Sequence, residues 1–155
     1  MNTVQQIAKH FREVYFGSNW TDVNLKDALA GVTWQQAIAQ VHDLNTIATL
    51  VFHINYYVNP QLEVLQGNPL QASDKYSFDL PPITNEADWQ ELVAKVFREA
   101  TLFAEQVEKL PESKLHEDFA DPTYGSYYRN LLGIIEHTYY HLGQIVLIKK
   151  LLNIK

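Results

Sequence analysis

The strongest constraint on the fold is an apolar stripe of helical period that continues for about six turns between residues 85 and 110. Side chains at three- and four-residue spacing share one face of a helix, and an apolar face must be buried against other elements. The stripe consists of Trp89, Leu92, Val93, Val96, Phe97, Ala100, Phe103, Ala104 and Val107. This segment predicts a long helix that begins at about Asn85 and ends before Pro111.

Two more helices are predicted in the first 60 residues. An apolar stripe within residues 4 to 15 is followed by Gly17, a residue that commonly ends helices. A second stripe follows Asn45 or Thr46, either of which can act as its N-cap. Pro60 is expected to end or kink this second helix, because proline lacks a backbone donor and clashes with the preceding turn.

A last helix is predicted to begin near Ser126 and to run to the C-terminus, and irregular segments separate it from the others. Residues 67 to 83 are rich in turn formers and include Pro81 and Pro82, so they predict a long loop. Residues 18 to 44 predict a connector with a short helical piece at residues 25 to 29. With no period-2 strand or repeat, the chain predicts one all-α domain, residues 1–155, folded as a four-helix bundle.

The composition makes several classes of partner improbable. The chain carries 12 Lys and Arg residues against 18 Asp and Glu residues, a net charge of -6, which disfavours binding to nucleic acid or to anionic lipid. No apolar run approaches the roughly 20 residues of a spanning helix, and the start lacks signal-peptide features, so a cytoplasmic location is expected. With no cysteine in the chain, any soft-metal site must use histidine.

The segment "IIEHTYYHLGQIVLIKKLL" places His137 and His141 four residues apart on one helix face. Ile134 and Ile145 share that face, so both imidazoles are expected to point into the bundle. On the second helix, His53 has apolar neighbours at helical spacing, which turns it toward the core as well. Three imidazoles are therefore predicted to converge.

Three neutral imidazoles with an open coordination position are typical of catalytic sites for first-row divalent metals. The His-x3-His spacing alone is weak evidence, because six histidines in 155 residues produce such pairs by chance. Burial adds weight, since each unpaired buried polar group costs about 1 to 3 kcal/mol and a shared metal would satisfy all three. The pair is not an HExxH motif, because the glutamate that acts as general base there is missing, and Glu136 is interpreted as a solvent-facing or supporting group.

Other polar and aromatic residues receive weaker interpretations. His10, His42 and His116 lie on a polar flank or in loops and are expected to be exposed. A substrate pocket beside the histidines is predicted to be lined by Tyr57, Tyr127 and Asn130.

His53 in "NTIATLVFHINYY" together with "EHTYYHLGQ" resembles the DinB/YfiT-like superfamily of metal-dependent enzymes. The resemblance covers nearly the whole chain in helix order and spacing. It implies an up-down-down-up bundle, a metal (Zn, Ni or Fe) held by His53, His137 and His141, and a homodimer. Some members use the metal to activate a small thiol such as bacillithiol, mycothiol or glutathione.

Two functions are compatible with these residues. In the first, the chain is a metal-dependent enzyme, a small-thiol S-transferase or a hydrolase, in which the metal lowers the pKa of a thiol or a water. In the second, it is a non-catalytic protein whose histidines hold an ion that ties helices together, or hold none. The metal's identity, the substrate and the reaction are not determined by the sequence.

Overall fold

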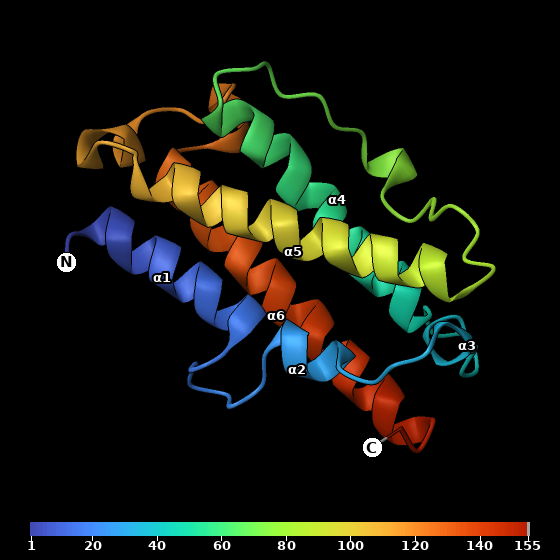
Figure 1. Ribbon diagram of the computed structural model, residues 1–155. Helices are drawn as coiled ribbons and strands as arrows, with labels where there is room; N and C mark the ends of the chain where they lie inside the picture. Colours follow the sequence, from blue (N-terminus) through green and yellow to red (C-terminus); the bar gives the residue numbers. More distant parts are fainter. Residues whose placement is uncertain (155) are drawn as a thin grey trace.

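The computed structural model describes residues 1–154. These residues form helices that are joined by irregular segments (Figure 1). The four long helices are α1 (Thr3–Phe16), α4 (Ile47–Leu65), α5 (Glu86–Glu108) and α6 (Tyr127–Leu151). The short ones are α2 (Leu25–Leu29), α3 (Trp34–Ala37) and the 3-10 turns η1 (Asp74–Tyr76), η2 (Glu112–His116) and η3 (Pro122–Tyr124). Among these residues an isolated bridge between Asp118 and Ser126 is the sole β-type pairing, so the all-α prediction is confirmed.

The ends of the long helices follow local capping chemistry. Thr46, Asn85 and Ser126 are the N-caps of α4, α5 and α6, and each side chain accepts a hydrogen bond from the backbone N–H three residues on. Gly17 ends α1 with a φ of 125°, a conformation that residues with a Cβ rarely adopt. These four predicted boundaries are confirmed.

The second helix does not end at Pro60. The helix α4 continues through Pro60 to Leu65. The proline was expected either to end or to kink the helix, and it does not end it. A proline removes only one backbone donor from the ladder, and the turn after it buries Leu62 and Val64. Packing of that last turn therefore outweighs the lost hydrogen bond.

The long helices pack side by side into a bundle, with α4 against α5 and α6, and α1 against α5 and α6. In Figure 1, α1 and α6 run in one direction, whereas α4 and α5 run in the other. The neighbours α4 and α5 are therefore parallel, and the chain between them must return along the whole bundle. The segment from residue 66 to residue 85 makes this return, as predicted for a long loop.

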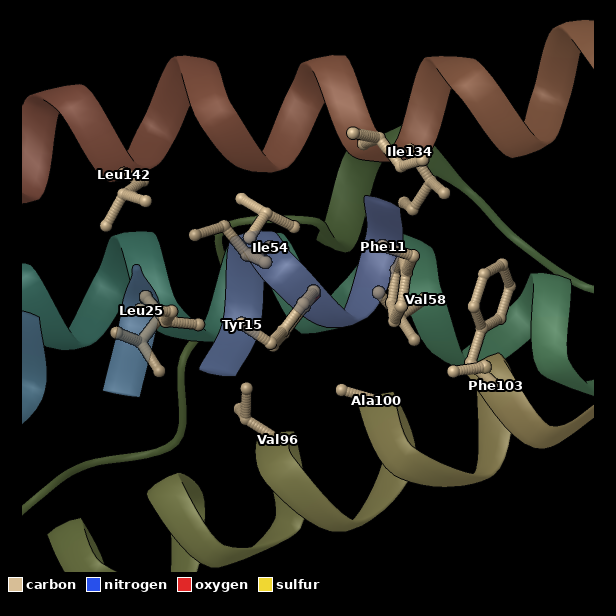
Figure 2. Close-up of a cluster of buried hydrophobic side chains, with 14 of the residues drawn as sticks. Phe11, Tyr15, Leu25, Ile54, Val58, Val96, Ala100, Phe103, Ile134 and Leu142 are labelled. Atoms are coloured by element: carbon tan, nitrogen blue, oxygen red, sulfur yellow. The ribbon is translucent and has the colours of Figure 1, made fainter. Parts of the chain in front are cut away.

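The core lies between all four helices, as Figure 2 shows. The rings of Phe11 and Phe103 meet with centroids 4.5 Å apart, which joins α1 to α5. The connector is held by Trp89, whose indole N–H donates to the carbonyl of Val32 over 2.8 Å. The remaining labelled side chains in that figure are Tyr15, Leu25, Ile54, Val58, Val96, Ala100, Ile134 and Leu142. None of the helices described within residues 1–154 has both the length and the hydropathy required to cross a bilayer.

Candidate metal centre

The three histidines predicted to converge do so. His53 projects from α4, and His137 and His141 project from α6, which packs against α4. One ring nitrogen from each residue lies within 4.8 Å of the others. The Nε2 atoms of His53 and His137 are 3.1 Å apart. We call these three residues the histidine cluster.

Two of the three imidazoles are oriented by a carbonyl oxygen. His53 Nδ1 is 3.0 Å from the backbone oxygen of Ser77, and His141 Nδ1 is 2.8 Å from Oε1 of Gln144. A carbonyl oxygen can only accept, so both Nδ1 atoms donate and therefore carry the hydrogen of the neutral ring. Their Nε2 atoms then hold bare lone pairs. Histidines that bind metals in proteins are usually held in this way.

The third imidazole, His137, lies beside both of the others, with ring centroids 5.0 Å from His53 and 4.5 Å from His141. Its Nε2 faces the Nε2 of His53, whereas its Nδ1 is buried and has no hydrogen-bond partner among residues 1–154. Burial, reinforced by the neighbouring His141 and His53, lowers the pKa of His137 to about 4. Burial also lowers the pKa of His53. Both rings are therefore neutral at pH 7, the protonation state that binds a metal.

Aromatic side chains and the long loop enclose the cluster. The ring of Phe78 stacks on His53 with centroids 3.8 Å apart, and Tyr57 meets His53 edge-on at 5.2 Å. The hydroxyl of Tyr57 donates to Asp74 Oδ1 over 3.0 Å, and that of Tyr56 donates to the Ser73 backbone oxygen over 2.7 Å. The tyrosines thus fasten the loop to α4 at the start of η1, and the Ser77 carbonyl, directly after η1, is held against His53.

Sequence reasoning missed the residues that orient and cover the histidines. Gln144 had a detectable signal, since it stands three residues after His141 in "HLGQ" and so lies on the same side of the helix. Ser77 and Phe78 had none, because they belong to an aperiodic loop 24 or more residues from His53. Their positions depend on how the loop packs.

A surface groove of about 250 Å³ adjoins the cluster. It is lined by Tyr57, Gln61, Arg129, Asn130, Gly133, Ile134, Glu136 and His137. Two of the three residues predicted to line a substrate pocket are therefore found here. The amide nitrogen of Asn130 already has two hydrogen-bond partners within the protein. It donates to the backbone oxygens of Tyr124 and Ser126 over 2.9 Å each.

The third predicted pocket residue, Tyr127, lies elsewhere. It is buried against Phe119, with ring centroids 5.0 Å apart, and does not line the groove beside His137. It borders a larger hollow of about 880 Å³ between the turn after α4 and the loop before α6, which no histidine lines. The larger hollow is therefore not the one that adjoins the histidine cluster. His10, His42 and His116 are exposed, as expected.

Comparisons with known proteins do not assign this site. No protein-family model, no curated protein and no solved structure matches the chain significantly.

Proposed function

We propose that the chain is a metal-dependent enzyme of the DinB/YfiT-like kind, in which His53, His137 and His141 hold one divalent ion of Zn, Ni or Fe. A divalent ion in such a site lowers the pKa of a bound thiol or water, so that a nucleophile is available at neutral pH. The reaction class is transfer of a small thiol to an electrophile, or hydrolysis. The proposal includes the up-down-down-up bundle and the homodimer that the resemblance implies.

The observation that carries the proposal is the pair of oriented rings. Ser77 and Gln144 hold the imidazoles of His53 and His141 so that two bare Nε2 atoms face the same space as His137. Among residues 1–154, the one hydrogen-bonding contact of these Nε2 atoms is that between His53 and His137, over 3.1 Å. An ion shared by the three rings would give each of them a partner.

The surrounding residues would assist in three ways. Ser77 and Gln144 hold the ligand tautomers, and Phe78 and Tyr57 pack against the ring of His53. The groove beside His137 leaves a path for a small molecule. A catalytic site needs such an accessible position, whereas a structural site is closed by protein ligands on all sides.

The first test is metal analysis of protein purified without an affinity tag. The wild type is expected to carry about one equivalent of a divalent metal per chain, and His141→Ala is expected to carry none. Screening with small thiols and electrophiles then tests the reaction class. A wild-type chain that takes up no metal when supplied with Zn, Ni or Fe would overturn the proposal.

The second candidate function, a structural ion, is separated from the first by chelation. Because the apolar core spans all four long helices, removal of a catalytic metal with EDTA is expected to leave the helical circular dichroism intact. A structural ion contributes folding energy outright, so chelation would instead cause cooperative loss of helix. That second result would favour the non-catalytic function.

A further inference from the structure

The loop between α4 and α5 reaches the histidine cluster while staying largely exposed itself. From residue 66 to residue 85, all of which the structure describes, Ser77 is the one buried residue. Phe78 stacks on His53, yet 45% of its surface is exposed. A segment with so few buried contacts is held weakly and opens at a low free-energy cost. The contact between Ser77 and His53 therefore depends on what else fastens the loop.

Tyr56 fastens this loop from outside the histidine cluster. Its hydroxyl donates to the backbone oxygen of Ser73 over 2.7 Å and accepts from the backbone N–H of the same residue over 3.4 Å. Among residues 1–154 its ring meets Phe52 and Tyr57 rather than a histidine. Tyr57 also holds the loop, but it packs against His53 as well, so its substitution would disturb two contacts at once. The influence of Tyr56 on the histidines runs through the loop.

A single short turn connects Ser73 to the acceptor of His53. The turn is η1, and it is closed by Ser77, whose backbone N–H and hydroxyl both donate to the backbone oxygen of Asp74 over 3.2 and 2.9 Å. These bonds make Ser73 and Ser77 move together. Release of Ser73 from Tyr56 therefore loosens the Ser77 carbonyl, which lies 3.0 Å from Nδ1 of His53.

We propose that Tyr56 is a positioning residue of the metal centre, and that docking of the loop and binding of the metal favour each other. The docked loop presents the Ser77 carbonyl, which keeps the hydrogen of His53 on Nδ1 and leaves Nε2 for the metal. A metal on Nε2 in turn requires that hydrogen on Nδ1, which favours the docked loop. The coupling is reciprocal, so each equilibrium shifts the other by the same factor. This inference rests on the proposed function, since the metal is one of the two coupled partners.

Limited digestion with trypsin measures loop docking. Lys75 lies in η1 and is the one Lys or Arg between Lys26 and Lys95, so cleavage after it yields two fragments of known mass. Zinc should slow this cleavage about tenfold relative to protein kept in EDTA. Cleavage follows the open population of the loop, and loss of a ligand's supporting contact lowers metal affinity by about that factor. Cleavage after Lys109, which is exposed at the end of α5, is the internal control and should not change.

Tyr56→Phe removes the hydroxyl and keeps the ring. In the zinc-free protein, cleavage after Lys75 should become about threefold to tenfold faster, as expected for loss of one hydrogen-bonding group. Zinc affinity should fall about twofold to tenfold, and by no more than the protection that zinc gives to the wild type. Tyr76→Phe is the matched control, because Tyr76 is exposed in the same loop and contacts Lys75 through its ring. It should match the wild type in both measurements.

The tautomer of His53 is a readout that a merely structural role would not change. NMR of the histidine ring nitrogens in the zinc-free protein should show less of the Nδ1–H form of His53 in Tyr56→Phe than in the wild type. His141 is held by Gln144 rather than by the loop, so its tautomer should be unchanged. If the His53 tautomer does not respond to Tyr56→Phe, the positioning role is overturned.

The outcomes separate the two proposals. If the wild type takes up no zinc, the proposed function fails and this inference fails with it. If zinc binds but cleavage after Lys75 is equally fast with and without it, only the coupling to the loop is overturned. Equal zinc affinity in Tyr56→Phe and Tyr76→Phe would overturn the role of Tyr56 as well.

Discussion

Two groups of buried polar side chains take residues from both α4 and α6. One is the histidine cluster. The other, which we call the core polar cluster, takes one residue from each long helix: Tyr15, Asn55, Glu99 and Thr138. Asn55 stands two residues after His53, and Thr138 directly follows His137. The same two helices therefore contribute to two sites with different chemistry.

The members of the core polar cluster mostly pair with protein groups. The Asn55 amide donates to Glu99 Oε2 over 2.7 Å, and Thr138 donates to the Ile134 backbone oxygen over 2.7 Å. The Tyr15 hydroxyl is buried beside Thr138 without a hydrogen-bond partner among residues 1–154, and burial raises the pKa of Tyr15 further above its usual range. This phenol therefore stays neutral at any ordinary pH.

The two clusters differ in how their unpaired polar atoms are arranged. Both clusters contain buried polar atoms without partners. In the histidine cluster, one ring nitrogen from each of three residues lies within 4.8 Å of the others, and a second hydrogen bond orients two of the rings. In the core polar cluster, the unpaired atoms are of different kinds, and none of its four residues lines the groove beside His137. Convergence, rather than burial, is the informative property.

The largest expected difference between the clusters is in metal binding. His53→Phe should weaken metal binding by more than about a hundredfold, because loss of a direct ligand exceeds the effect of losing a supporting contact. Tyr15→Phe is the matched variant in the other cluster and should retain the full metal content. Metal per chain after dialysis measures both. Equal metal content in the two variants would break the distinction.

The next largest effect is on stability and belongs to the core polar cluster. Asn55→Leu should lower the free energy of unfolding by about 1 to 3 kcal/mol, because Oε2 of Glu99 loses its hydrogen-bond donor and the carboxylate keeps only the ion pair with Lys95, at 3.9 Å. The side chain of Glu99 is only 12% exposed. Urea denaturation measures the loss, and the double variant Asn55→Leu/Glu99→Leu should recover part of it. A double variant no more stable than the single one would show that the carboxylate is not the cause.

A smaller effect should follow from changing a supporting residue of the histidine cluster. Gln144→Leu removes the acceptor that orients His141, and metal affinity should fall about tenfold. Gln144→Glu keeps an acceptor oxygen and should keep most of the affinity. Competition with a chelating dye measures both. If Gln144→Leu binds metal as tightly as the wild type, the orientation of His141 does not depend on this contact.

The smallest expected effect is a gain. Tyr15→Phe removes a buried hydroxyl that has no partner, so the free energy of unfolding should rise by up to about 1 kcal/mol. Thermal and urea unfolding at neutral pH measure it. A loss of stability would mean that the hydroxyl has a partner, such as Thr138, in solution.

The helices and the direction of the histidines could be predicted because they depend on local patterns. The N-caps of the last three long helices accept hydrogen bonds from backbone N–H groups only three residues further along the chain. These caps are Thr46, Asn85 and Ser126. Likewise, the apolar neighbours of His53 and His137 at helical spacing determine which way each ring points. Such information is carried within one or two turns of sequence.

The parts that could not be predicted depend on contacts between distant segments. Ser77 reaches His53 only because an aperiodic loop packs on α4. The pairing of Asn55 with Glu99 joins residues that are 44 positions apart, and nothing in the apolar sequence around Asn55 indicates it. Pro60 shows the limit of a local rule, because burial of the following turn keeps the helix intact.

The parallel arrangement of α4 and α5 requires a connection that returns along the bundle, and part of that connection covers His53. The 19 residues of α4 span about 28 Å, so the chain must travel that distance back before α5 can begin. About nine extended residues would be enough. The connection from residue 66 to residue 85 has about twice that length, and the surplus forms η1 and the Ser77–Phe78 contact with His53. A shortened connection could still close the bundle, but it would remove the Ser77 and Phe78 contacts of His53, so the extra chain length beyond loop closure is what orients and covers this imidazole.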